Sequence, residues 1–294
     1  MKSIVKKGHC LTFVRLGQRA ILTLCIALFS LFIHGCQSQP TQPNPAQSSA
    51  PGFTFEKIRS TEFDHWLATP ENTITNLRCL TIYLEGDGIP FLAQGSRISA
   101  NPTGYKNPLL QLSQKDNENA VWLGRPCYFG LQTSRHCNPH LWTFGRYSEE
   151  VVRSLTELVK TLAVDKPVIL VGHSGGGVLA TLVAQRSPQV TAVVTLAAPL
   201  DTDRWTASHG YSPLYDSINP AQLPSRADIY QLHLTGSQDT QVTFQHQQKY
   251  LQHNPYAKHA KLAGVNHPLD NLASKDWLAL IQQVRKASGC YMNH

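Results

Sequence analysis

The sequence predicts an α/β fold, with a mostly parallel central sheet of about eight strands and helices on both faces. From Phe53 onward, strand-like runs alternate with helix-like runs, as in parallel strands joined by crossover helices. The run at residues 167–171 (PVILV) is apolar throughout, as expected for a central strand covered on both faces. The 294 residues suffice for one large domain of this kind.

The expected strands are short runs rich in β-branched, leucine and aromatic residues. The strongest are residues 79–84, 120–124, 167–171, 190–196, 229–234 and 259–264, and two weaker runs precede them at 53–57 and 63–68.

The clearest helix-like run is 147–163, which places its apolar residues on one face. Ser148 stands at the N-cap position, and Glu149 and Glu150 interact favourably with the helix dipole. Residues 243–253 and 273–287 are further expected helices.

Composition and charge indicate a globular protein without a nucleic-acid partner. Hydrophobic residues make up 41% of the chain and charged residues 15%, which is ordinary for a folded domain. The net charge of +7 depends on residues 1–35, which hold five of the 26 basic residues and no acidic one. The rest of the chain is close to neutral, so the charge gives no support for nucleic-acid binding.

Residues 1–35 read as a signal peptide. A basic stretch is followed by 14 apolar residues at 20–33. A membrane-spanning helix needs roughly 20, so this run suits the core of a cleaved signal better than a permanent anchor.

The end of that run, LFIHGCQS, resembles a bacterial lipobox with Cys36 as the acylated residue. The resemblance implies cleavage before Cys36, attachment of fatty acyl chains such as palmitate, and a membrane-anchored protein of the bacterial cell envelope. Gln37 resembles the signal for an outer membrane location facing the periplasm. The alternative is an ordinary secreted protein, cleaved nearby, in which Cys36 is free.

Residues 36–52 are rich in Pro, Gln and Ser and lack apolar periodicity. They are expected to form a flexible tether after the lipidated cysteine, and the folded domain is expected to span residues 53–294.

The remaining cysteines suit an oxidising compartment. Cys127 and Cys137 flank a short loop-like segment and are the expected disulfide. Cys79 and Cys290 form either a second disulfide or two free thiols. No cysteine pair has zinc-ligand spacing and the 13 histidines are scattered, so neither a metal site nor a cofactor is expected.

Residues Gly172–Gly176 (GHSGG) fit the G-x-S-x-G pattern between an expected strand and an expected helix. A sharp turn of this kind holds the serine hydroxyl above the sheet, and the close approach of strand and helix requires the glycines. No phosphate-binding glycine motif accompanies the pattern. We therefore interpret Ser174 as a catalytic nucleophile.

Two further residues follow in the order that a catalytic triad on this scaffold requires. Asp239 lies just after the strand at 229–234, and His267 just after the strand at 259–264. His267 is the expected general base and Asp239 the residue that orients it. Asp201, at the end of the preceding strand, is the alternative acid.

The segment EGDG after the first strong strand is the expected second half of an oxyanion hole. The amide of Asp87, with Gly86 allowing the turn, would act together with the amide of Gly175. The alternative is a plain glycine turn in which Glu85 and Asp87 are solvated carboxylates.

These residues together resemble the α/β-hydrolase superfamily. More narrowly, EGDG, RPC (125–127), WTFGRYSEEVV (142–152), GHSGGG, LD…W (201–205), HGYSPL (209–214) and SINP (217–220) resemble a group of bacterial lipoprotein-type serine hydrolases, from about Leu80 to the C terminus. The substrates of that group are poorly defined.

The expected function is a serine hydrolase that cleaves carboxylic esters through an acyl-enzyme. Residues 199–226 contain no long amphipathic helix that could form a lipase lid, so short or soluble acyl substrates are expected. A peptidase or amidase using the same triad, and a non-catalytic envelope lipoprotein, are the alternatives. His173 is expected to pack under the sheet edge and not to take part in catalysis.

Overall fold

The computed structural model describes residues 51–72, 78–116 and 118–291. The expected signal peptide, Cys36 and most of the tether lie outside the described residues. In the described part of the chain, no helix is both long enough and apolar enough to cross a membrane.

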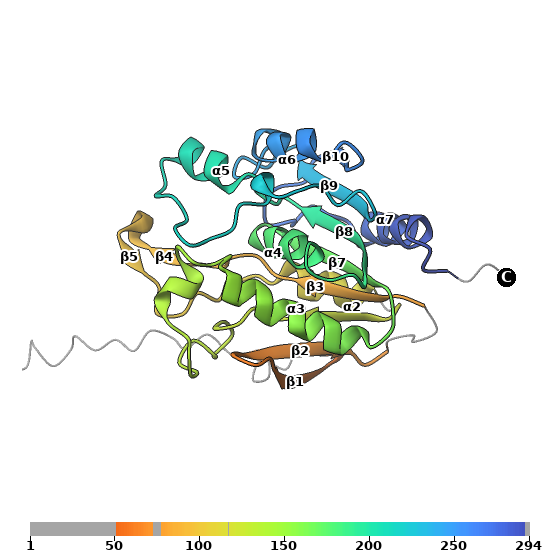
Figure 1. Cartoon of the computed structure of the whole chain (residues 1–294), viewed down its shortest axis with the longest axis horizontal. Helices are drawn as coiled ribbons and strands as arrows, with labels where there is room; N and C mark the ends of the chain where they lie inside the picture. Colours follow the sequence, from red (N-terminus) through yellow and green to blue (C-terminus); the bar gives the residue numbers. More distant parts are fainter. Residues whose placement is uncertain (1–50, 73–77, 117, 292–294) are drawn as a thin grey trace, which may run out of the picture. The chain divides into compact units, whose positions relative to one another are not determined.

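The core is an eight-stranded sheet in the order β1-β2-β6-β3-β7-β8-β9-β10 (Figure 1). β1 and β2 form an antiparallel hairpin, β2 runs antiparallel to β6, and every other neighbouring pair is parallel. The strands are β1 (Phe53–Arg59), β2 (Asp64–Pro70), β3 (Leu80–Leu84), β6 (Ala120–Leu123), β7 (Val168–His173), β8 (Val190–Leu196), β9 (Tyr230–Gly236) and β10 (Lys258–Leu262). The expected mostly parallel sheet is confirmed, and each expected strand is present.

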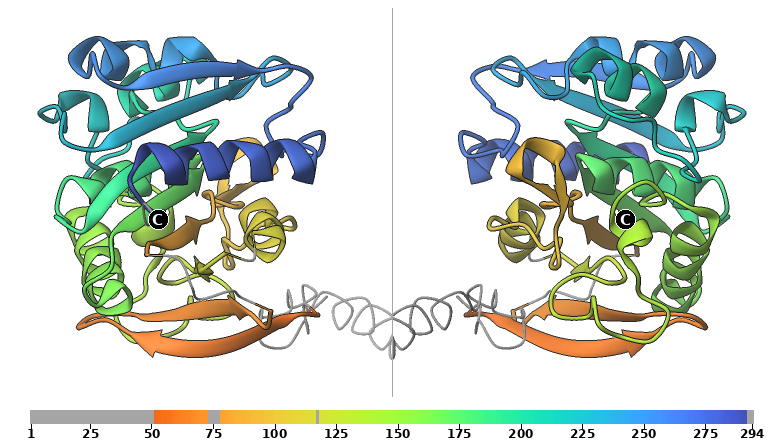
Figure 2. Two further views of the ribbon diagram at one scale, coloured as in Figure 1. Left: turned by 90° about the vertical axis from the view of Figure 1, so that its right-hand side faces the viewer. Right: turned by 90° about the vertical axis from the view of Figure 1, so that its left-hand side faces the viewer.

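Helices cover both faces of the sheet. α2 and α7 lie on one face, and α3 and α4 lie on the other (Figures 1 and 2). The helices are α2 (Pro108–Lys115), α3 (Glu149–Ala163), α4 (Gly175–Ala184), α5 (Thr202–His209), α6 (Gln248–His253) and α7 (Ser274–Ala287). A small hairpin of β4 (Phe91–Leu92) and β5 (Arg97–Ile98) lies outside the main sheet.

The helix boundaries differ from the sequence prediction in informative ways. Ser148 occupies the N-cap of α3, but its side chain makes no capping bond. The helix expected at 243–253 is a 3₁₀ turn at Phe244–His246 followed by α6. The eight-residue α2 and α5 were not predicted, because helices this short carry little apolar periodicity.

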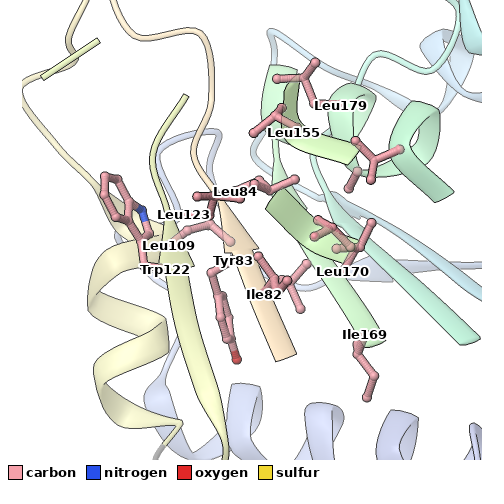
Figure 3. Packing of buried hydrophobic residues seen from close by; sticks show 14 of the residues in the cluster. Ile82, Tyr83, Leu84, Leu109, Trp122, Leu123, Leu155, Ile169, Leu170 and Leu179 are labelled. Atoms are coloured by element: carbon pink, nitrogen blue, oxygen red, sulfur yellow. The ribbon is translucent and has the colours of Figure 1, made fainter. Parts of the chain in front are cut away.

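The central strands β3, β6 and β7 are buried along their whole length. In Figure 3, Ile82 and Leu84 of β3 lie between Leu123 of β6 and Leu170 of β7. Burial of both faces explains why these strands read as continuous apolar runs.

Two disulfides reinforce the fold. Cys127 pairs with Cys137, as predicted. Cys79 pairs with Cys290, which settles the choice that the sequence left open. The second bond joins the chain just before β3 to the segment after α7.

Candidate active site

Ser174 stands at the corner between β7 and α4 with φ 50° and ψ −122°, a backbone conformation that L-residues rarely adopt. Glycines on either side make the corner feasible. A Cβ on Gly172 would lie 2.3 Å from the carbonyl oxygen of Gly176, and one on Gly176 would lie 2.2 Å from that of Leu84. The strained turn expected from the G-x-S-x-G pattern is therefore present.

Three side chains from distant parts of the chain form one hydrogen-bonded row. Nε2 of His267 lies 3.2 Å from Oγ of Ser174, and Nδ1 of His267 lies 2.9 Å from Oδ2 of Asp239. Ser174 follows β7, Asp239 follows β9, and His267 follows β10, all at the carboxyl edge of the parallel strands. The structure thus brings together the three residues that the sequence singled out.

Asp239 is held as a carboxylate. Its Oδ1 accepts the amides of Gln241, at 2.8 Å, and Val242, at 2.9 Å. Burial alone would raise the pKa of Asp239, but the hydrogen bond and charge of His267 and the two amides outweigh burial and lower it. An ionised Asp239 favours the imidazole tautomer with hydrogen on Nδ1, which leaves Nε2 free to accept a proton from Ser174.

Asp201, the alternative acid, does not contact His267. Its Oδ1 accepts the amide of Arg204 at 3.3 Å and the side-chain amide of Asn219 at 3.0 Å. Asp201 is the N-cap of α5, a structural role that accounts for its position at the end of β8.

Gly86 and Asp87 lie beside the serine corner. A Cβ on Gly86 would be 3.2 Å from Cβ of Ser174, and one on Gly175 would be 1.9 Å from Oδ1 of Asp87. Within the described residues, the amides of Asp87 and Gly175 donate to no protein acceptor. Both remain available for a ligand oxygen near Ser174.

The side chain of Asp87 is only 13% exposed and is fully paired, so it is not the free carboxylate of the alternative drawn from the sequence. It forms ion pairs with Arg125 and with Arg146, the latter at 3.1 Å, and accepts a hydrogen bond of 2.5 Å from Tyr147. Burial opposes ionisation, but the two arginines and Tyr147 hold the pKa of Asp87 at about 2. Sequence reasoning missed this cluster, although RPC and FGRY, which supply its basic residues, were part of the family resemblance.

Glu85, at the start of the same loop, is also buried. Its Oε1 accepts the amide of Leu110 at 2.8 Å and the indole N–H of Trp122 at 3.3 Å. Burial raises the pKa of Glu85 to about 7, and these hydrogen bonds offset only part of that rise. Glu85 and Asp87 therefore differ by about five units in pKa, because only Asp87 is paired with arginine.

His173, next to the serine, is buried as expected. Its Nε2 donates to the backbone carbonyl oxygen of His267 at 2.7 Å. Burial lowers the pKa of His173 to about 4, so its ring is neutral near pH 7. This bond fixes the backbone of the loop that carries His267.

Two of these side chains, Ser174 and His267, open onto a pocket of about 1060 Å³, and Asp239 lies buried behind them. Gly86 and Asp87 of the turn after β3 lie in the same wall. Aromatic side chains supply much of the rest, namely Phe91, Tyr105, Tyr128, Phe129, Phe144, Trp205 and Tyr211. Among the described residues, no group of three or more His, Cys, Asp or Glu side chains could hold a metal ion.

Part of the chain matches a known family. Residues 140–267, which contain Ser174, Asp239 and His267, match the family model of the PGAP1-like alpha/beta domain. No curated protein matches the sequence.

Solved structures with the same fold include several hydrolases. An esterase from Pyrococcus furiosus is 15% identical with a TM-score of 0.54, and the match covers 80% of this chain and 91% of that one. An α/β serine hydrolase without a lid from Xanthomonas campestris is 12% identical with a TM-score of 0.50, covering 82% and 97%. A proline iminopeptidase-related protein from Thermus thermophilus is 13% identical with a TM-score of 0.54, covering 80% and 98%.

A prolyl endopeptidase structure is 14% identical with a TM-score of 0.54, but this chain spans only 39% of its length. At these identities the likeness concerns the fold. The chain has the α/β-hydrolase fold.

Proposed function

We propose that this protein is a serine hydrolase that cleaves carboxylic esters through an acyl-enzyme. The observation that carries the proposal is the hydrogen-bonded row of Ser174, His267 and Asp239, of which Ser174 and His267 line the pocket. Esters of short or soluble acids fit best, because the longest helix within residues 199–226 is the eight-residue α5, too short for a lipase-type lid.

In this proposal Nε2 of His267 takes the proton of Ser174 as Oγ attacks the ester carbonyl carbon. The amide of Gly175 and an amide of the Gly86–Asp87 turn hold the resulting oxyanion. His267 then gives its proton to the leaving alcohol, and an acyl-serine remains. Water, deprotonated by His267, cleaves the acyl-serine, releases the acid and restores Ser174.

A fluorophosphonate probe tests the nucleophile. The wild-type protein is expected to label at Ser174, and Ser174→Ala is expected to lose the label and the esterase activity. Equal labelling of both proteins would show that Ser174 is not the nucleophile.

A panel of p-nitrophenyl esters and matched aminoacyl and peptidyl amides separates an esterase from a peptidase or amidase. Fast amide turnover with negligible ester turnover would favour a peptidase.

We also propose that the mature protein is anchored in the bacterial cell envelope by acyl chains on Cys36, which lies outside the described residues. The lipobox-like sequence supports this location. Mass spectrometry of the mature N terminus is expected to find an acylated cysteine, and Cys36→Ser is expected to release the protein from the membrane fraction. An unmodified N terminus elsewhere would rule the anchor out.

A further inference from the structure

The cluster around Asp87 carries one positive charge in excess. Arg125 and Arg146 are both ion-paired to the single carboxylate of Asp87, which is ionised because its pKa is about 2. Arg125 is 1% exposed and Arg146 is 4% exposed. A buried charge that lacks a full partner is costly, so a further anion at this place would be stabilised.

Only one of the two arginines is open to the pocket. Nε of Arg146 donates to the carbonyl oxygen of Thr143 at 2.5 Å, and its Nη1 donates to Asp87. Its Nη2 donates to no atom of the described residues, and it is not sealed from solvent as the unpaired Nε of Arg125 is. Arg146 is among the residues that line the pocket and Arg125 is not.

Arg146 and the residue after Ser174 lie on either side of the same carboxylate, that of Asp87. Oδ2 of Asp87 pairs with Arg146, and Oδ1 lies against Gly175, the residue after Ser174, where an added Cβ would fall 1.9 Å from it. An anion on Arg146 would therefore lie near the carbonyl group that Ser174 attacks. Beside it the wall is apolar, with the ring of Phe91 5.9 Å from Cζ of Arg146 and in edge contact with Phe144.

We propose that the pocket selects esters that carry a carboxylate on the acyl part, and that Nη2 of Arg146 binds this carboxylate. The inference rests on the proposed function, because a preference among esters presupposes ester hydrolysis. The preference for a carboxylate can nevertheless be measured as binding, without turnover. The competing explanation is that the excess positive charge only stabilises the oxyanion of the transition state. In that case the loss of Arg146 would lower kcat/KM equally for neutral and anionic esters.

Two activated esters that differ only in charge test the preference: p-nitrophenyl hydrogen glutarate and its neutral methyl ester. The wild-type protein is expected to have the higher kcat/KM for the anionic ester. In Arg146→Gln the ratio of the two kcat/KM values is expected to fall about 10- to 100-fold, the usual effect of losing a charged hydrogen bond. An unchanged ratio, whatever the absolute loss, would overturn the proposal.

Lys106 supplies the matched control. It also lines the pocket, but its ammonium group is paired with Asp270 at 2.7 Å and its side chain is 63% exposed. Lys106→Gln removes the same charge and is expected to leave the ratio unchanged. Arg146→Lys keeps a positive charge and is expected to retain part of the preference, which separates loss of binding from loss of folding.

A binding measurement keeps the inference distinct from the proposed function. In Ser174→Ala, calorimetric titration is expected to find monomethyl glutarate bound at least about tenfold more tightly than dimethyl glutarate, and Arg146→Gln added to it is expected to abolish the difference. Equal affinities in Ser174→Ala would refute the carboxylate preference. Failure of Ser174 to react with a fluorophosphonate would instead refute the proposed function alone.

Discussion

At the scale of single residues, hydrogen bonds distinguish the two acids that could orient His267. Asp239 accepts from His267, whereas Asp201 caps α5. Asp239→Asn is expected to lower kcat by about 10⁴-fold, because an amide favours the wrong imidazole tautomer. Asp201→Asn is expected to leave kcat and the melting temperature nearly unchanged, since asparagine caps a helix as well as aspartate does. Steady-state kinetics and thermal unfolding of both variants check this, and comparable losses of kcat would contradict it.

The residues that form the row Ser174–His267–Asp239 were predictable because each lies in the turn or loop after a recognisable strand. The G-x-S-x-G pattern marks the turn, and the carboxyl ends of parallel strands meet at one edge. The partners of Asp87 were not predictable from any spacing. Arg125 and Arg146 approach it from loops 38 and 59 residues further along the chain, so no local periodicity connects them to it.

At the scale of secondary-structure elements, Glu85 links three of them. It follows β3, and its carboxyl group accepts hydrogen bonds from Leu110 in α2 and Trp122 in β6. Burial raises its pKa from 4.5 to about 7, so the folded protein holds this proton more tightly than the unfolded chain. The stabilisation from this proton is complete below pH 4.5 and is lost as the pH rises through 7, a change of about 3 kcal/mol.

Glu85→Gln keeps an acceptor oxygen and removes the titration. Relative to this variant, the wild-type protein is expected to lose about 3 kcal/mol in its free energy of unfolding between about pH 4.5 and 8. Urea unfolding of both proteins across this range measures the difference in their free energies of unfolding. The contributions of all other titratable groups are common to both proteins and cancel in this difference. Parallel pH profiles would mean that folding does not raise the pKa of Glu85.

The elements themselves were predictable to different degrees. The eight strands were found because β-branched runs bounded by turn residues are a strong local signal, above all in the fully apolar β7. α5 was missed because only Thr202 and Thr206 of its residues are buried, so it has no apolar stripe. Its start depends instead on the side chain of Asp201, the alternative catalytic acid of the sequence prediction.

At the scale of the whole molecule, the two disulfides are expected to differ in how much they stabilise the fold and in how they affect activity. Cys79–Cys290 spans 211 residues, and Cys127–Cys137 spans 10. In the chain-entropy account, the long loop stabilises the folded state by about 5 kcal/mol and the short one by about 3 kcal/mol. The short bond lies next to Tyr128, whose hydroxyl donates to the backbone of Asp87 at 3.1 Å, and two residues from Arg125.

Replacing each pair with alanine should therefore separate stability from activity. Cys79→Ala with Cys290→Ala is expected to give the larger loss in the free energy of unfolding while kcat is retained, because this bond lies at the end of β3 opposite the turn that carries Gly86 and Asp87. Cys127→Ala with Cys137→Ala is expected to cost less stability but to lower kcat, because it loosens the loop that holds Arg125 against Asp87. Denaturant unfolding and ester kinetics on both double variants test this. A lower kcat in the 79/290 variant with normal kcat in the 127/137 variant would mean that the long bond, and not the short one, sets the geometry of the pocket.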